Sequence, residues 1–160
     1  MMRPEADEAW ANATVTVPGM IYWTSGEAPE VSRWDPFEPS RSFLRPAPTA
    51  PRTIDSNYIA DAVAAFTRTG FHGSLNYHRA IDPFTRYSAA FAGAKIRQPS
   101  MFLAGTLDGL NLVAQPSAES MRSNLTDLRS FTMLEGVGHW PQLEAPEATN
   151  AALLAFLQSL

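Results

Sequence analysis

The sequence contains no cysteine, no long apolar run and no block of like charge. Without cysteine there can be no disulfide framework, no thiolate metal site and no thiol nucleophile. No stretch approaches the ~20 apolar residues of a membrane-spanning helix, and "MMRPEADEAW" lacks the basic start and apolar run of a signal peptide. We therefore expect a soluble, cytoplasmic protein.

Positive charge is also scarce, with 12 basic against 16 acidic side chains and a formal net charge of −4. This balance gives no reason to expect nucleic acid or an anionic membrane as a partner. The length of 160 residues and the 45% hydrophobic content are enough for one domain with a core of its own.

Prolines are concentrated between Pro29 and Pro51, in "PEVSRWDPFEPSRSFLRPAPTAP". Because proline removes backbone donors, we expect an extended loop over 29–51, and a loop of this length usually serves as a lid, a binding loop or a linker. Four aromatic residues lie in or near it. Either they line an apolar pocket or they fix the loop to the core: Trp23, Trp34, Phe37 and Phe43.

Helical patterns follow the loop. "TIDSNYIADAVAAFTRTGF" predicts a helix capped by Asp55 or Ser56 and ended by Gly70. Its apolar face would be formed by Ile59, Ala62, Val63 and Phe66. A second short helix is expected with Ser74 as its cap, ending before the Asp-Pro pair, and a third over 84–92.

The last third of the sequence predicts strand, helix, strand, helix. "PSMFLAGTLDG" and "RSFTMLEGVGH" are apolar runs that end in glycine-containing loops, and 110–125 can form a crossover helix between them. "APEATNAALLAFLQSL" predicts an amphipathic helix. Its apolar face would be formed by Leu153, Phe156, Leu157 and Leu160. Two parallel strands make an incomplete sheet, so the fold class is α/β with part of a larger sheet.

Asp108 and His139 each follow a predicted strand, at the edge where open α/β sheets gather catalytic side chains. An aspartate that accepts a hydrogen bond from one imidazole nitrogen fixes the tautomer, and the other nitrogen can then take a proton. The alternative is a structural role, with Asp108 as a turn residue before Gly109 and His139 as an ordinary loop side chain.

Three stretches, "RTGFHGSLNYHRAID", "FAGAKIRQPSMFLAGTLD" and "MLEGVGHWPQLEAPEATNAALLAFL", resemble in order and separation the C-terminal half of α/β-hydrolases of the epoxide hydrolase group. The resemblance implies a partial helical lid over 1–92 and the C-terminal part of the hydrolase core over 93–160. It implies that Asp108 is the acid and His139 the base of the catalytic triad. Trp140 and Phe71 are the candidate substrate contacts.

Enzymes of this group open an epoxide with an aspartate, and the His–Asp pair then drives water onto the resulting ester. Lid tyrosines donate hydrogen bonds to the epoxide oxygen. The family's Asn-Trp-Tyr-Arg is here Asn76-Tyr77-His78-Arg79, so the lid donor is either His78 or, after a helix rotation of ~100°, Tyr77. An imidazole with a pKa of ~6.5 is a different acid from a phenol with a pKa of ~10.

The family's nucleophile lies on a sharp strand-to-helix turn in its N-terminal half, and these 160 residues contain neither Gly-x-Asp-Trp-Gly nor Gly-x-Ser-x-Gly. The expectation is therefore a fragment without nucleophile and oxyanion hole, with negligible hydrolysis alone and a small apolar epoxide or ester as substrate if it is completed. We expect no cofactor and no metal, because the histidine spacing matches no metal signature.

Three alternatives stay open on the sequence alone. One is a non-catalytic module, or a half-enzyme, that pairs through its exposed sheet edge with a second copy or with a complementing N-terminal half. Another is an ester hydrolase or dehalogenase of the same fold. The third is a coding remnant with a misplaced start, which the Met1-Met2 pair does not settle.

Overall fold

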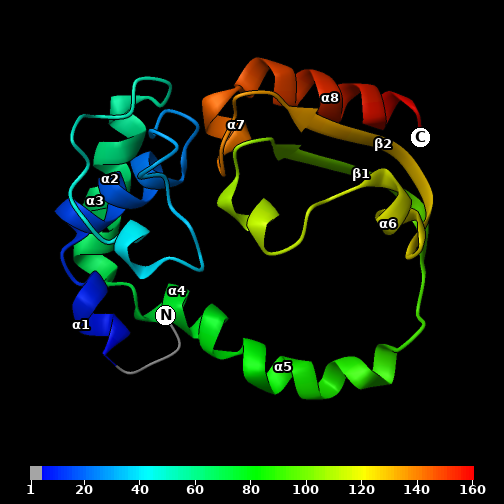
Figure 1. Ribbon diagram of the computed structural model, residues 1–160, viewed down its shortest axis with the longest axis horizontal. Helices are drawn as coiled ribbons and strands as arrows, with labels where there is room; N and C mark the ends of the chain where they lie inside the picture. The colour runs from blue at the N-terminus through cyan, green and yellow to red at the C-terminus, as the bar shows by residue number, and fades with distance from the viewer. Residues whose placement is uncertain (1–4) are drawn as a thin grey trace.

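A computed structural model describes residues 5–160; residues 1–4, with the Met1-Met2 pair, lie outside the described part. Its elements form a helical region over 5–92 and a sheet region over 93–160 (Figure 1). The helical region contains α1 (Ala6–Trp10), α2 (Ala13–Thr24), η1 (Pro39–Arg41), α3 (Ser56–Thr69), α4 (His72–Arg79), α5 (Ile81–Ser88) and η2 (Ala89–Phe91). The sheet region contains β1 (Ile96–Gly105), η3 (Gly109–Leu112), α6 (Ala118–Arg122), β2 (Leu125–Leu134), α7 (Pro141–Glu144) and α8 (Pro146–Gln158).

The core of the molecule is built around α2, which the sequence pattern did not predict. Val17 and Ile21 are 1% and 3% exposed, and the neighbouring Trp10 is packed edge-on against Phe43 and Phe71. A helix buried on most sides has no polar stripe and therefore no amphipathic period. Pro18 inside it removes one backbone donor as well. Burial of the surrounding side chains holds the helix in place despite that loss.

The helix predicted after the loop is confirmed as α3. Asp55 caps it, with a side-chain oxygen that accepts from the Asn57 amide at 2.8 Å, and Gly70 ends it at φ +66°. The predicted apolar face packs against the core.

The next two helices begin earlier than predicted. The prediction of Ser74 as a cap is wrong, because α4 already begins at His72, where burial of Leu75 (0% exposed) fixes the helix more strongly than a cap would. It ends at Arg79, before the Asp82-Pro83 pair, as expected. Helix α5 begins at Ile81 and not at 84, because Pro83 falls in its first turn, where a missing N–H is tolerated.

Residues 29–51 form a loop, as predicted, with the short η1 as their one helical turn, but the loop is not extended throughout, because it turns at 30–32 and 36–37. Arg41 crosses it, donating to the carbonyls of Arg33 and Glu30 at 2.7 and 2.8 Å and pairing with Asp35 at 3.2 Å. The Arg45 guanidinium lies 3.5 Å from the Trp23 ring centroid. The Arg41 contacts hold the loop together internally, and the Arg45 contact joins it to α2.

Strands β1 and β2 pair in parallel, as predicted. The crossover between them is less helical than expected: only η3 and the five-residue α6 form within 110–125. Pro116 separates the two, since proline interrupts a continuous helix, and Ser117 caps α6 by accepting from the Ser120 amide at 3.1 Å.

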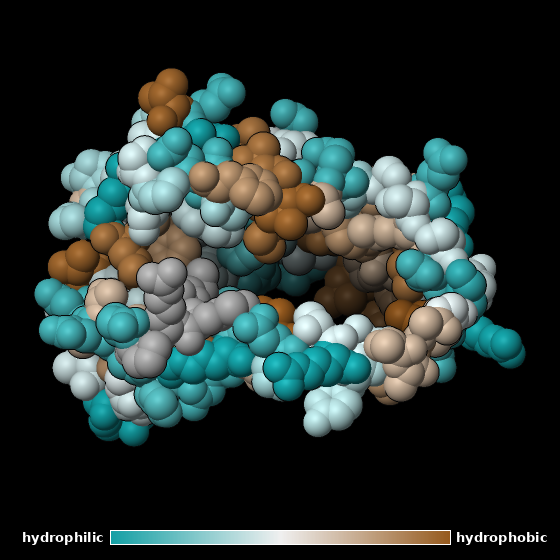
Figure 2. Space-filling model, turned by 60° about the horizontal axis from the view of Figure 1, so that its bottom comes forward, coloured by the Kyte–Doolittle hydropathy of each residue, from teal (hydrophilic) through white to brown (hydrophobic). Residues whose placement is uncertain are grey.

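The sheet has one covered and one open face. Helix α8 lies along one face, while α5 arches away below the other, and Figure 2 shows a deep hollow behind α5 with hydrophobic side chains on its inner wall. Large apolar side chains are exposed on both helices, including Phe84 (64%) and Tyr87 (69%) on α5 and Leu157 (50%) on α8. No helix among residues 5–160 has both the length and the apolar character needed to cross a membrane.

Candidate active site

Asp108 is held in the loop that follows β1. This loop continues the strand pairing: the Thr106 and Leu107 amides donate to the carbonyls of Leu134 and Val137, each at 2.9 Å. Gly105 makes that approach possible, because a Cβ there would lie 2.1 Å from the Val137 carbonyl oxygen. One oxygen of Asp108 then caps η3 by accepting from the Leu110 amide at 2.9 Å. The other oxygen points back toward the loop after β2.

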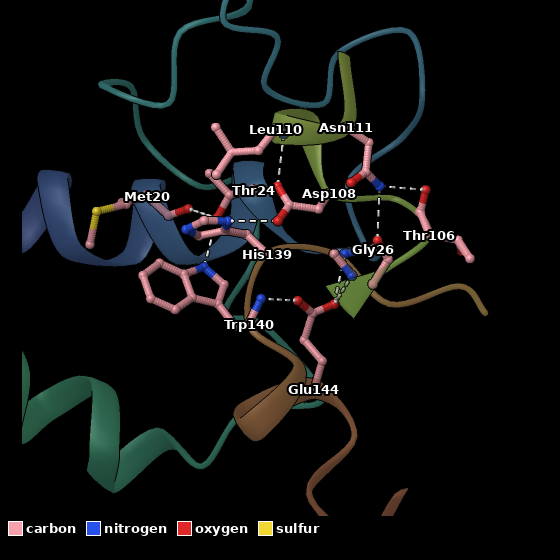
Figure 3. Close-up of polar contacts among 12 residues, drawn as sticks. Met20, Thr24, Gly26, Thr106, Asp108, Leu110, Asn111, His139, Trp140 and Glu144 are labelled. Carbon is pink, nitrogen blue, oxygen red and sulfur yellow. Dashed lines mark hydrogen bonds and ion pairs between the residues drawn. The ribbon is translucent and has the colours of Figure 1, made fainter. Parts of the chain in front are cut away.

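His139 meets that second oxygen. Its Nδ1 lies 3.0 Å from Asp108 Oδ2, and the two side chains are 32% and 13% exposed (Figure 3). A carboxylate only accepts hydrogen bonds, so the arrangement assigns the proton to Nδ1. Nε2 is then the nitrogen that can take a proton from water or a hydroxyl group.

The environment of Asp108 favours its charged form. Burial on its own would raise the pKa of the carboxyl group. The hydrogen bond from His139, the Leu110 amide and the charge of the imidazole outweigh burial, so the pKa of Asp108 is lowered below its ordinary value. Asp108 therefore stays an acceptor at neutral pH and can stabilise an imidazolium.

The C-terminal end of α2 anchors the loop that carries His139. The His139 amide donates to the Thr24 carbonyl at 3.0 Å. The Trp140 indole donates to the Thr24 hydroxyl at 2.6 Å, and that hydroxyl donates to the Met20 carbonyl at 2.7 Å (Figure 3). No sequence motif pointed to Thr24, which lies 115 positions before the histidine. The helical region thus fixes the backbone of the candidate base.

His139 faces a largely apolar cavity of about 370 Å³. Its walls come from both regions of the molecule: Trp10, Met20, Thr24, Trp34, Pro36, Phe43, His78, Leu110, His139 and Trp140. The Trp34 ring is tilted against the imidazole at 6.5 Å between centroids, and the Trp140 ring at 4.9 Å. A mostly apolar cavity with a few polar groups is the usual form of a small-molecule site.

The aromatic residues of the loop divide between the two roles left open by the sequence. Trp34 and Phe43 line the cavity. Trp23 instead is buried at 8% exposure, with its indole donating to the Pro46 carbonyl at 3.2 Å, so it fixes the loop. Phe37 is 68% exposed and serves neither role here.

The structure also separates the candidate lid residues. His78 lines the same cavity as His139, whereas Tyr77 is 77% exposed and borders a different surface pocket beside α5. Phe71, the other expected substrate contact, has a ring that is 3% exposed and stacked on Phe66 at 4.3 Å between centroids, outside the walls of this cavity. Trp140 does line the cavity.

His72 is more exposed than His139 and lies outside the candidate site. His72 is 72% exposed at the start of α4, and its Nδ1 lies 3.0 Å from Asp7 on α1. Among residues 5–160, no group of three or more His, Cys, Asp or Glu side chains is arranged to hold a metal ion.

The chain is similar to known epoxide hydrolases. The chain is 44% identical over 160 residues to an epoxide hydrolase of Caballeronia sordidicola, a match that covers 99% of this chain and 49% of the relative. It is 36% identical over 112 residues to epoxide hydrolase A of Mycobacterium tuberculosis, covering 69% of this chain and 34% of the relative. No family model matches the sequence.

Solved structures of epoxide hydrolases superpose on the chain as well. The crystal structure of epoxide hydrolase A from Mycobacterium thermoresistibile superposes with a TM-score of 0.83 at 29% identity, over 98% of this chain and 50% of the other. An epoxide hydrolase from an endophytic Streptomyces gives 0.84 at 25%, with the same coverage. The chain thus spans about half the length of the relatives it matches. It belongs to the epoxide hydrolase group of the α/β-hydrolases and corresponds to the C-terminal half of these proteins.

Proposed function

We propose that these 160 residues supply the general base, His139, and its orienting acid, Asp108, to an enzyme that hydrolyses epoxides to diols. The observation that carries this proposal is the 3.0 Å contact between His139 Nδ1 and Asp108 Oδ2, at the carboxyl ends of two neighbouring parallel strands and beside an apolar cavity. The names of the relatives favour an epoxide as substrate over the ester and halide alternatives.

The reaction needs a carboxylate nucleophile that is not among these residues. That carboxylate attacks one epoxide carbon, the C–O bond breaks, and the released oxygen takes a proton from solvent while the ester forms. His78, in the wall of the cavity, is the lid group proposed to donate a hydrogen bond to this oxygen. Its imidazole replaces the phenol of the family motif.

His139 acts in the second step. Nε2 takes a proton from water as the water oxygen attacks the ester carbonyl carbon, and the imidazolium returns that proton to the departing diol oxygen. The carboxyl group of the nucleophile then releases a proton to solvent, which balances the proton taken up in the first step. The carboxylate is thereby regenerated and one water is consumed per epoxide. Asp108 stabilises the imidazolium without leaving its hydrogen bonds to the ring and to the Leu110 amide.

The uncovered apolar surface supports a contribution from residues outside this segment. The open sheet face and the exposed side chains of α5 border the hollow seen in Figure 2. We propose that the nucleophile-bearing residues cover this surface, because apolar area of this extent is normally buried against further structure. Whether they belong to the same chain or to another does not change the chemistry.

Fusion of this chain to the N-terminal half of the Caballeronia sordidicola relative tests the proposal. We expect the fusion to hydrolyse styrene oxide, the chain alone to show negligible turnover, and His139→Ala to lower the rate of the fusion by roughly 10²–10⁴-fold. p-Nitrophenyl esters are assayed in parallel to test the ester alternative. A folded fusion that turns over epoxide equally well with and without His139 would refute the proposed role.

A further inference from the structure

Glu144, the last residue of α7, binds backbone from both regions of the molecule. Its carboxylate accepts three hydrogen bonds from main-chain amides: Oε2 from Gly26 at 2.8 Å and from Gly138 at 2.9 Å, and Oε1 from Trp140 at 2.9 Å (Figure 3). Gly26 lies 118 positions earlier in the chain, directly after α2. One partly buried side chain therefore joins the end of the helical region to the loop of the candidate base.

These bonds fix the backbone on both sides of His139. The amides of three successive residues are all engaged: Gly138 and Trp140 donate to Glu144, and His139 itself donates to the Thr24 carbonyl at 3.0 Å. The α7 turn closes the arrangement, because the Glu144 amide donates back to the Trp140 carbonyl at 2.8 Å. The peptide planes before and after the histidine consequently have little freedom to rotate.

The two glycines show how closely the segments approach. A Cβ on Gly138 would lie 2.5 Å from both the Gly26 nitrogen and the Thr24 carbonyl oxygen. A Cβ on Gly26 would lie 2.0 Å from the Gly136 carbonyl oxygen. The amides can reach a shared carboxylate only because neither position carries a side chain.

We propose that Glu144 is a positioning residue for His139: it sets the orientation of the imidazole toward Asp108 by fixing the amides on either side. The proposal rests on the proposed function insofar as it concerns catalysis, but the orientation itself does not depend on any reaction. Hydrogen bonds from backbone amides to a charged carboxylate are among the stronger ones in proteins, and groups that orient a catalytic base govern its tautomer.

Glu144→Gln is the informative change, because glutamine keeps the size of the side chain but puts an N–H₂ group where one carboxylate oxygen accepted a hydrogen bond. That group faces an amide donor, so at least one of the three bonds is lost. The matched control is Glu147→Gln, an identical change three residues later on the exposed first turn of α8.

The experiment reads the ring nitrogens of His139 by ¹H–¹⁵N long-range NMR on the ¹⁵N-labelled chain, at a pH where the imidazole is neutral. His139→Gln assigns the signal, and His72, whose Nδ1 also contacts an aspartate, is the internal reference. We expect His139 with its proton on Nδ1 in the wild type and in Glu147→Gln, and loss of that preference in Glu144→Gln, while His72 is unchanged.

An unchanged His139 tautomer in Glu144→Gln, with shifted amide signals of Gly26, Gly138 and Trp140, would overturn the proposal. If Glu144→Gln does not fold, Glu144→Asp, which keeps the charge but shortens the reach, is judged by the same criterion. In the fusion enzyme we expect Glu144→Gln to lower kcat with little change in KM. If the tautomer of His139 depends on Glu144 but the fusion does not hydrolyse epoxide, the proposed function is refuted and the positioning role of Glu144 still holds.

Discussion

The helical region and the sheet region of this chain are buried to very different degrees. Within residues 5–160, every buried apolar side chain except Val137 lies between positions 6 and 75, in α1 to α4 and their connections. Neither β1, β2 nor α8 contains one. The helical region has a core of its own, whereas the sheet region is an assembled surface that further structure can cover.

The two regions meet where the candidate chemistry lies. Asp108 and His139 come from the sheet region, but the groups that hold the histidine loop include Thr24 and Gly26 from the helical region. The backbone of the candidate base is therefore anchored in part by the better packed region of the chain. The His–Asp pair can therefore form even though the sheet that carries it has an open face.

Leu75→Ala tests the core of the helical region and has the largest expected effect. Leu75 is fully buried, so its truncation removes apolar contacts and leaves a cavity, at a cost of about 2–5 kcal/mol in the free energy of unfolding. Urea titration followed by circular dichroism measures it. A loss below about 1 kcal/mol would mean that α4 is not packed as the structure has it.

Gly138→Ala tests the close contact between the two regions. The new methyl group would collide with the Gly26 nitrogen and the Thr24 carbonyl oxygen at 2.5 Å, so we expect a destabilisation of about 1–3 kcal/mol. Gly73→Ala is the control, because a Cβ there meets nothing within 4 Å. Equal stabilities for the two variants would show that the regions do not approach so closely.

Asp108→Asn tests the contribution of the sheet region to acid sensitivity. The folded-state pKa of Asp108 is lowered, so its charged form adds stability that is complete above its unfolded pKa of about 3.9 and is lost as the pH falls below that value. We expect the variant to lose less stability between pH 6 and pH 3 than the wild type. Denaturant midpoints across this range measure the difference, with the exposed Asp61→Asn on α3 as control.

Leu157→Ala has the smallest expected effect on the chain itself. The side chain is 50% exposed on α8, and its truncation is expected to change the free energy of unfolding by no more than about 0.5 kcal/mol. Comparison with Leu75→Ala uses the same chemical change in both regions. A cost as large as that of Leu75→Ala would contradict the contrast between a packed and an uncovered region.

The elements with clear starting and terminating residues were predictable from sequence. A capping aspartate and a terminal glycine define α3, and the two apolar runs with glycine-containing loops define the strands and bring Asp108 next to His139. Helix α2 was not predictable, because a helix buried on most sides has no amphipathic period and its internal Pro18 argues against a helix. The crossover was overestimated because Pro116 divides it. The domain boundary at residue 92 stays a prediction.

The positioning groups of the site could not be predicted from local pattern. Thr24 and Gly26 act across more than a hundred residues, and their contacts depend on tertiary structure alone. Glu144 did have a signal, since it lies in the stretch "MLEGVGHWPQLEAPEATNAALLAFL" that carries the family resemblance, but its three amide partners could not be identified from that stretch. That His78 lines the cavity and Tyr77 does not is likewise a result of the tertiary structure.

The proposed role of His139 as the base of the second chemical step is tested most directly by trapping the covalent intermediate. The fusion enzyme with His139→Ala is mixed with styrene oxide and analysed as intact protein by mass spectrometry. Because water attack on the ester needs the base and ester formation does not, we expect one substrate mass added to the variant and none accumulated on the unmodified fusion. A folded variant that gains no mass, or that continues to release diol at the unmodified rate, would contradict the assignment.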